Sequence, residues 1–181
     1  MGNEPERQLI RRLRAGDDAA FRQILKDHLA PLTRYAIRMT NSTSDAEDIV
    51  QETFVKFWLS KDQFNPERAK LTTWLHRIAH NLCIDHFRAV RPSGTEQNEA
   101  TQLGPENNYH EDARASMLDT ALMQLSEQQR SALVMCHYQG MRQNDAAMIL
   151  KISVDALEST LRRGRTKLRE LLDDQGLTNE T

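Results

Sequence analysis

The sequence predicts an all-α protein built from two small helical domains joined by a flexible linker, the second domain containing a helix-turn-helix. Three observations support this fold class. Apolar residues recur at spacings of three and four, without the strict alternation that is typical of strands. A polar, acidic segment interrupts this pattern at residues 92–112. Near the C-terminus, two short apolar patterns flank a three-residue turn.

Length and composition are those of a globular protein without a membrane span. The 181 residues are enough for one medium domain or two small ones. No apolar run approaches the roughly 20 residues that a bilayer requires, and residues 1–18 are too charged for a signal peptide. We therefore expect a cytoplasmic protein. Cys83 and Cys136 lie far apart in the sequence, so we expect two buried thiols and no disulfide framework.

Charge is distributed unevenly along the chain and marks the domain boundaries. Residues 1–91 carry 15 basic and 12 acidic residues, residues 92–112 carry 0 and 5, and residues 113–181 carry 9 and 9. The middle segment contains two prolines, two glycines and almost no large apolar residue, so it buries too little surface to offset its ordering entropy. We predict domains over 1–91 and 113–181 and an acidic linker over 92–112.

The helices of the first domain are predicted from caps and apolar stripes. One helix begins near residues 17–18, whose carboxylates suit a first turn, and Pro31 interrupts or restarts it. A turn follows at residues 41–44, where Ser44 and Glu47 form a possible capping box. The next two helices are amphipathic, one from residue 45 to about 60 and the other over 71–90.

The second domain is predicted to hold a helix over 114–125, a helix over 126–140 that Ser126 caps and Gly140 stops, and a helix-turn-helix. The helix-turn-helix consists of residues 142–151, a turn at 151–153, and a long helix over 154–172. Residues 161–169 of the long helix carry five basic residues and no acidic residue, a composition that suits contacts with phosphates.

Four segments carry a resemblance to a known family: residues 45–58, 72–88, 125–141 and 152–171. In this order and spacing they resemble a bacterial sigma factor of the extracytoplasmic-function group, in the sigma-70 family, and the resemblance covers nearly all of residues 7–172. It implies that the first domain is region 2, which binds core RNA polymerase and recognises and melts the minus-10 element. The second domain would be region 4, which recognises the minus-35 element.

The resemblance implies that residues 45–58 contact core polymerase. An acidic row beside aromatic anchors suits a basic coiled-coil surface. The residues expected to make this contact are Asp48, Gln51, Glu52, Phe54 and Phe57. The alternative for the aromatic residues is burial in the core, and for Trp58 we favour that alternative.

Residues 64–91 match the family segment that captures the non-template strand of the minus-10 element. Strand capture requires a pocket for an unstacked base and a basic track for the backbone. The candidates are Asn65, Lys70, Thr73, Arg77, His80, Asn81, Asp85 and Arg88. A solvated helix face is the alternative for the basic residues, and Trp74 suits the core better than stacking on a base.

In the second domain, the first turns of the long helix are expected to enter the major groove. The candidates for minus-35 contacts are Asp155, Ala156, Glu158, Ser159, Arg162, Arg163, Arg165 and Lys167. The sequence departs from the common family pattern, which has glycine at Lys151, threonine at Ala156 and basic residues at Glu158 and Thr160. An acidic Glu158 accepts from cytosine but repels phosphate, which predicts an unusual minus-35 sequence.

The partners that the resemblance implies are core RNA polymerase, promoter DNA and an anti-sigma factor, which can be membrane-anchored; we expect no direct membrane insertion. The implied role is promoter-specific initiation of transcription in a stress or envelope response under anti-sigma control. In the family the linker threads toward the RNA exit path, and a solvated tether is the alternative here.

Two other classes of function stay open. A stand-alone helix-turn-helix regulator would use the first domain for sensing or dimerisation, without an exposed acidic and aromatic helix. A metal-responsive protein would use His76, His80 and Cys83, which share one helix face. Arg77 stands where a metalloprotease helix needs glutamate, and no nucleophile motif or phosphate-binding loop is present. We expect no enzyme activity, no cofactor and no metal.

Overall fold

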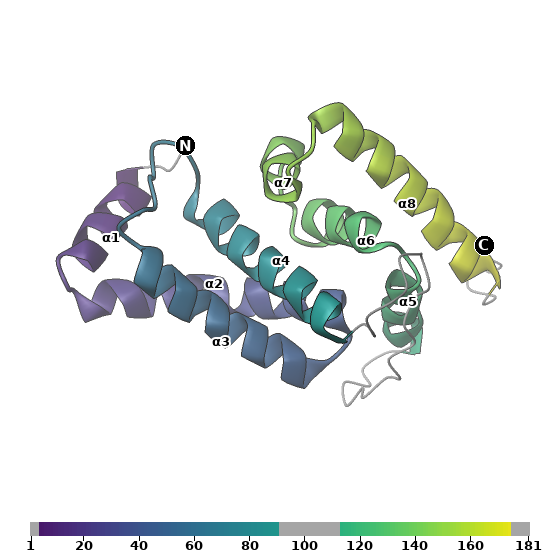
Figure 1. Ribbon diagram of the computed structural model, residues 1–181, viewed down its shortest axis with the longest axis horizontal. Helices are drawn as coiled ribbons and strands as arrows, with labels where there is room; N and C mark the ends of the chain where they lie inside the picture. Colours follow the sequence, from purple (N-terminus) through teal and green to yellow (C-terminus); the bar gives the residue numbers. More distant parts are fainter. Residues whose placement is uncertain (1–3, 91–112, 175–181) are drawn as a thin grey trace.

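The computed structural model describes residues 4–90 and 113–174, and every regular element in these two ranges is helical (Figure 1). The predicted all-α fold class is confirmed. The predicted linker at 92–112 lies outside the described residues. The helices are α1 (Glu4–Arg14), α2 (Asp18–Thr40), α3 (Thr43–Ser60), α4 (Leu71–Val90), α5 (Ala113–Met123), α6 (Glu127–Leu133), the π-helix η1 (Val134–Tyr138), α7 (Gln143–Leu150) and α8 (Val154–Asp174). No helix in the described ranges has the length and apolar character of a membrane span.

Helices α1 to α4 form the first domain, in which α2 packs against the other three (Figure 1). Its core contains the fully buried side chains of Tyr35, Phe57, Phe64 and Leu75. Helix α4 has the bounds that the sequence predicts. Helix α1 was not predicted; it is tied to this core by Ile10 and Leu13, each 1% exposed.

Helix α2 continues through Pro31, where we predicted an interruption. Proline removes one backbone donor and usually kinks or breaks a helix. Ile24 before Pro31 and Leu32 and Tyr35 after it are all fully buried, so the core holds both halves of the helix. Packing therefore outweighs the local cost of the proline.

The prediction that Ser44 caps the next helix is wrong by two residues. Ser42 is the N-cap of α3, and its Oγ accepts a hydrogen bond from the Asp45 backbone N–H at 3.2 Å. The cause is a short connection: Asn41 ends α2 in the left-handed region at φ 55°, and Ser42 is already extended. Asparagine tolerates this conformation better than most residues.

In the second domain, helix α6 begins with a capping box and continues directly into a π-helix. The prediction that Ser126 caps the helix is confirmed, because Ser126 and Gln129 exchange the two hydrogen bonds of a capping box. The predicted helix over 126–140 continues from α6 into the π-helix η1, in which Gln139 N–H donates to the Val134 carbonyl at 3.0 Å. Gly140, at φ +61°, then turns the chain into α7.

Helices α7 and α8 form the predicted helix-turn-helix. Lys151 ends α7 at φ 55°, a left-handed conformation that costs a non-glycine residue about 1 kcal/mol or more. Ser153 caps α8 by accepting from the Ala156 backbone N–H at 3.1 Å. A Cβ at Gly164 would lie 3.1 Å from a methyl carbon of Leu133, so glycine allows α8 to lie close to α6.

The two domains pack directly against each other, with α2 and α4 facing α6, η1 and α7 (Figure 1). Arg130 is the most buried charged residue of this interface, at 5% exposed. Its Nη1 donates to the Met39 carbonyl at 2.6 Å, and its guanidinium lies 5.1 Å from the ring centroid of Phe87. Gln139 Nε2 donates to the Pro31 carbonyl at 3.1 Å. The hydrogen bonds to Met39 and Pro31 join residues 91 and 108 positions apart.

His80 lies in the same interface, although the sequence predicted it on the wet face of α4. Its Nδ1 is 3.1 Å from the Tyr35 hydroxyl and 3.3 Å from the Ser131 hydroxyl. Burial, with a smaller effect of the positive charge on Lys151, lowers the pKa of His80 to about 4. The imidazole is therefore neutral at physiological pH.

Replacement of Arg130 by alanine should loosen the docking of the two domains. The change removes a charged donor from a buried carbonyl, a loss of about 1.5–3 kcal/mol. We expect a larger radius of gyration in small-angle X-ray scattering and a lower free energy of unfolding in urea. Arg162→Ala, at an exposed position of α8, is the control. An unchanged scattering curve for Arg130→Ala would contradict the proposed role of Arg130.

Acid should destabilise the protein through His80. In the unfolded chain His80 binds its proton near pH 6.5 and in the folded chain only near pH 4. The stability that depends on neutral His80 is thus complete above about pH 6.5 and is lost as the pH falls toward 4, by up to about 1.4 kcal/mol per pH unit. Urea denaturation at pH 7, 6 and 5 measures this slope. His80→Gln, which cannot titrate, should show a shallower slope; an equal slope would contradict this prediction.

Candidate functional site

An apolar groove runs between α2 and α3 on the first domain. Its volume is about 610 Å³. Four of its large apolar side chains are exposed: Leu29 by 49%, Val55 by 51%, Trp58 by 36% and Leu59 by 77%. Exposed apolar side chains that gather in one groove, rather than lying singly, are typical of a surface that binds a partner. The other lining residues are Phe21, Leu25, Thr33, Glu47, Val50, Gln51 and Phe54.

Four of the five residues predicted to contact polymerase lie in this groove or beside it on α3. Asp48, Gln51 and Glu52 are exposed, and Phe54, at 5% exposed, lines the groove. Phe57 differs from the prediction, because it is fully buried and belongs to the core. It can support the groove from beneath but offers no surface to a partner.

The groove contains residues that the sequence analysis did not select. Trp58 was expected in the core, yet it lies at the groove wall, with its ring centroid 4.9 Å from that of Phe21. Lys61 Nζ lies over the Trp58 ring, 4.4 Å from its centroid. Val55 and Leu59 were missed, although a second apolar pair at i and i+4 outside the core stripe was visible in the sequence. Leu29 belongs to the apolar face predicted for the helix that begins near residue 17, and the structure exposes it in the groove.

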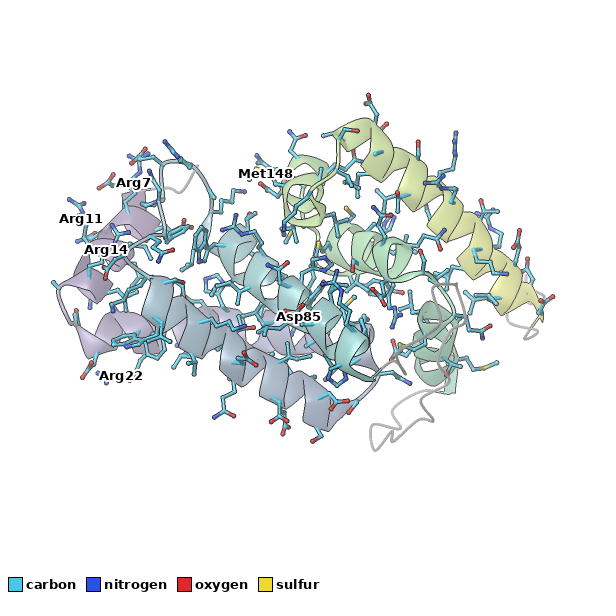
Figure 2. The ribbon with its side chains drawn as sticks, in the orientation of Figure 1. Arg7, Arg11, Arg14, Arg22, Asp85 and Met148 are labelled. Atoms are coloured by element: carbon cyan, nitrogen blue, oxygen red, sulfur yellow. The ribbon has the colours of Figure 1, made fainter. Side chains whose placement is uncertain are left out.

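The predicted minus-10 residues divide into an accessible group and a covered group. Thr73 and His80 are 5% and 9% exposed; His80 contacts Ser131 of the second domain, and Thr73 and Lys70 line an open pocket of about 430 Å³ whose other wall comes from the second domain. The accessible side chains are Asn65, Lys70, Arg77, Asn81, Asp85 and Arg88. Figure 2 shows Asp85 on α4, where it pairs with Arg88 at 3.6 Å.

A column of three side chains links the loop before α4 to the accessible face of α4. The ring of Phe64 is 1% exposed and lies 5.5 Å from the ring of Trp74. The guanidinium of Arg77 lies over Trp74, 4.2 Å from a ring centroid. A base could therefore stack on this Trp74 ring face only by displacing Arg77, whereas the Arg77 guanidinium itself presents a flat cationic surface.

In the second domain, α8 turns its polar side outward. Leu157 and Leu161 are buried, and Thr160 Oγ1 donates to the Ala156 carbonyl at 2.8 Å. Seven of the eight predicted minus-35 residues are exposed and one, Ser159, is half-buried. The exposed ones are Asp155, Ala156, Glu158, Arg162, Arg163, Arg165 and Lys167. The helix thus presents acidic Asp155 and Glu158 at its start, followed by a basic middle stretch over residues 162–169.

The structure does not support the metal alternative. His76 Nδ1 lies 2.9 Å from the Thr72 carbonyl, and His80 Nδ1 is occupied by Tyr35 and Ser131. Burial lowers the pKa of His76 and raises the pKa of Cys83 to about 12, which keeps the thiol protonated. Within residues 4–90 and 113–174, no three His, Cys, Asp or Glu side chains are placed to hold an ion. Cys136 is half-buried rather than buried as predicted.

Comparison with protein families identifies both domains. Residues 24–92 match the model of sigma-70 region 2, and residues 115–168 match the model of sigma-70 region 4. The ECF RNA polymerase sigma factor SigE of Mycolicibacterium smegmatis is 30% identical over 167 residues, which cover 87% of this chain and 64% of SigE. The chain thus spans less than two thirds of that relative. The ECF RNA polymerase sigma factor SigW of Bacillus subtilis is 30% identical over 91% of this chain and 95% of SigW.

Two solved structures share the fold at the level of both domains. CnrH in complex with the cytosolic domain of CnrY matches with a TM-score of 0.74 and 30% identity over 93% of this chain and 97% of CnrH. The sigma factor RpoE of Bartonella quintana, in complex with the anti-sigma factor NepR, matches with a TM-score of 0.66 and 28% identity over 84% and 96%. The family matches in both domains and the relatives that extend over nearly the whole chain show that the protein belongs to the extracytoplasmic-function group of RNA polymerase sigma factors.

Proposed function

We propose that the chain binds core RNA polymerase through the groove between α2 and α3 and directs it to promoters that its two domains read together. The observation that carries this proposal is the combination of an exposed apolar groove on the first domain with a helix-turn-helix on the second. A regulator that only bound duplex DNA would have no use for such a groove. The polymerase supplies the chemistry, and the chain supplies specificity.

The groove suits an amphipathic helical partner with a basic rim. Its floor is apolar, and Glu47, Asp48 and Glu52 stand exposed on the same helix, α3. Full burial of one large apolar side chain contributes about 1.5–3 kcal/mol, so the exposed Leu29, Val55 and Leu59 give an anchor of several kcal/mol. The acidic rim then favours a partner of opposite charge and the correct orientation.

The accessible face of α4 and the loop before it are proposed to hold the minus-10 strand. Arg77 and Arg88 provide charge for the phosphates, while Asn65, Asn81 and Asp85 provide groups for base edges. A contact by His80 requires the second domain to move away, because Ser131 of that domain hydrogen-bonds the His80 ring in the described arrangement.

The outward side of α8 is proposed to enter the major groove at the minus-35 element. Arg163, Arg165 and Lys167 suit phosphates, whereas Asp155, Glu158 and Arg162 suit base edges. Glu158 offers a carboxylate to a cytosine amino group and weakens the attraction for phosphate. We therefore propose that the second domain binds its element with modest affinity and relies on the polymerase-bound first domain.

An anti-sigma factor is the proposed regulator, within a stress or envelope response. RpoE, which shares this fold, was solved in complex with an anti-sigma factor. The same apolar groove would serve as its binding surface, since one exposed patch can accept either partner. We also propose that this regulator can be anchored in a membrane and that the chain acts in the cytoplasm. We further propose that the first domain ends at residue 91 and the second begins at residue 113.

Binding to bacterial core RNA polymerase, measured by fluorescence anisotropy of the labelled chain, tests the proposed function. Leu59→Ala removes an exposed anchor, and Asp48→Arg reverses the charge of the rim. We expect each to weaken binding about tenfold or more, as loss of an interface anchor does, while Glu170→Arg on α8 serves as the charge-reversal control.

Two outcomes would contradict the proposal. One is binding of Leu59→Ala and Asp48→Arg at wild-type affinity, which would place the polymerase contact elsewhere. The other is a folded wild-type chain that fails to bind core polymerase but binds duplex DNA alone, which would favour a stand-alone helix-turn-helix regulator.

A further inference from the structure

We propose that helix α1 is a brace that positions the loop over residues 61–70, and that Arg14 is its principal positioning residue. The loop joins α3 to α4 and carries Asn65 and Lys70, so this inference rests on the proposed role of the loop in minus-10 recognition. Helix α1 itself lies outside residues 24–92, which match the region 2 model. Figure 2 shows Arg7, Arg11 and Arg14 along α1.

Arg14 donates hydrogen bonds to the carbonyl groups at the start of the loop. Its Nη2 donates to the Lys61 carbonyl at 3.1 Å, to the Asp62 carbonyl at 3.3 Å and to the Phe64 carbonyl. The last carbonyls of a helix lack intrahelical donors and carry a partial negative charge, so a guanidinium is well suited to them. One side chain from α1 thus fixes the end of α3 and the first four residues of the loop.

Two further side chains of α1 hold the far end of the loop. Glu6 Oε1 accepts a hydrogen bond from the Leu71 backbone N–H at 2.9 Å, which caps α4 from a residue 65 positions earlier. Arg7 Nη2 pairs with Glu67 Oε2 at 2.9 Å. The loop is therefore held at both ends by the same helix.

The brace is itself rigidly attached to the domain. Ile10 and Leu13 lie in the core, and Arg12 pairs with Asp17 at 2.7 Å across the turn that leads to α2. The loop adds its own order, because Asn65 Oδ1 accepts from the Glu67 backbone N–H at 2.9 Å. A loop that a packed helix already holds in place loses less conformational entropy when a DNA strand binds to it.

The brace also extends to the accessible face of α4. The Phe64 carbonyl is bound by Arg14, the Phe64 ring contacts Trp74, and Arg77 lies over Trp74. A shift of Phe64 would therefore move the platform under Arg77. We infer that α1 sets the geometry with which the loop and Arg77 meet the minus-10 strand, without touching DNA.

The first test measures the brace in the free chain, whatever its function. Arg14→Ala should speed hydrogen exchange of the loop amides that have bonds in the folded state, those of Gln63, Glu67, Arg68 and Ala69. We expect about a tenfold increase, the effect of losing one charged hydrogen bond of about 1.4 kcal/mol. Arg11→Ala is the matched control, since Arg11 lies on the same helix and pairs with Glu4 at 3.0 Å.

The second test measures the consequence in the holoenzyme. Core polymerase with each variant transcribes a pool of duplex templates with randomised minus-10 positions, and the enriched sequences are read. Arg14→Ala should lower the preference for the best minus-10 sequence over single-base variants about tenfold, Arg14→Lys should fall between, and Arg11→Ala should match wild type. Loss of general stability would reduce all transcripts together and leave this preference unchanged.

The outcomes separate the brace from the function on which it rests. Unchanged loop exchange in Arg14→Ala, or an unchanged minus-10 preference despite faster exchange, would overturn the brace. If the Arg14→Ala chain does not bind core polymerase, the minus-10 preference of the holoenzyme with Arg14→Lys decides whether the brace acts. A wild-type holoenzyme that selects no minus-10 sequence would instead contradict the proposed function, while the exchange data would still report on α1.

Discussion

Helix α2 contributes to three surfaces at once, and this is the constraint on which the rest of the structure depends. One side packs into the core of the first domain through Ile24, Leu32 and Tyr35. A second side supplies Leu25 and Leu29 to the apolar groove, and the C-terminal part carries the Met39 carbonyl that receives Arg130. Because one continuous helix performs all three tasks, continuity through Pro31 couples the groove to the docking of the second domain.

In the docked arrangement of the two domains, some candidate surfaces are exposed and others are partly covered. The groove and the outward side of α8 are open in the docked arrangement, whereas part of α4 lies under the second domain. The proposed polymerase contact can thus form without any movement of the domains, whereas the proposed minus-10 contact of His80 cannot. Two buried polar side chains hydrogen-bond across the interface, His80 through Nδ1 to the Ser131 hydroxyl and Arg130 through Nη1 to the Met39 carbonyl, which favours one docking geometry.

Local sequence patterns predicted those features that depend on local physics. The bounds of α4 follow from its apolar period, and the Ser126 cap follows from a serine and a glutamine three residues apart. Departure from a family pattern was also informative: Lys151 replaces the usual glycine at a left-handed position, and the structure shows the strained φ there. The helix-turn-helix was predictable because its turn and its buried residues lie close together in sequence.

The features that were missed depend on contacts between distant residues. Ser42 displaced Ser44 because the end of α2 sets the geometry of the connection, and His80 is buried because a second domain covers α4. The exposed Leu59 is apolar but faces a groove whose other wall comes from α2. No window of one helix contains such information, and the role of Arg14 is visible only because α1 and the loop over 61–70 meet in space.

The central claim is that this chain gives core RNA polymerase its choice of promoter. The most direct measurement is transcription by bacterial core polymerase on a pool of genomic DNA fragments, with and without the chain, followed by sequencing of the transcript 5′ ends. The account predicts discrete new start sites only when the chain is present, preceded by two short shared sequences at a constant separation. The same set of 5′ ends with and without the chain would contradict it.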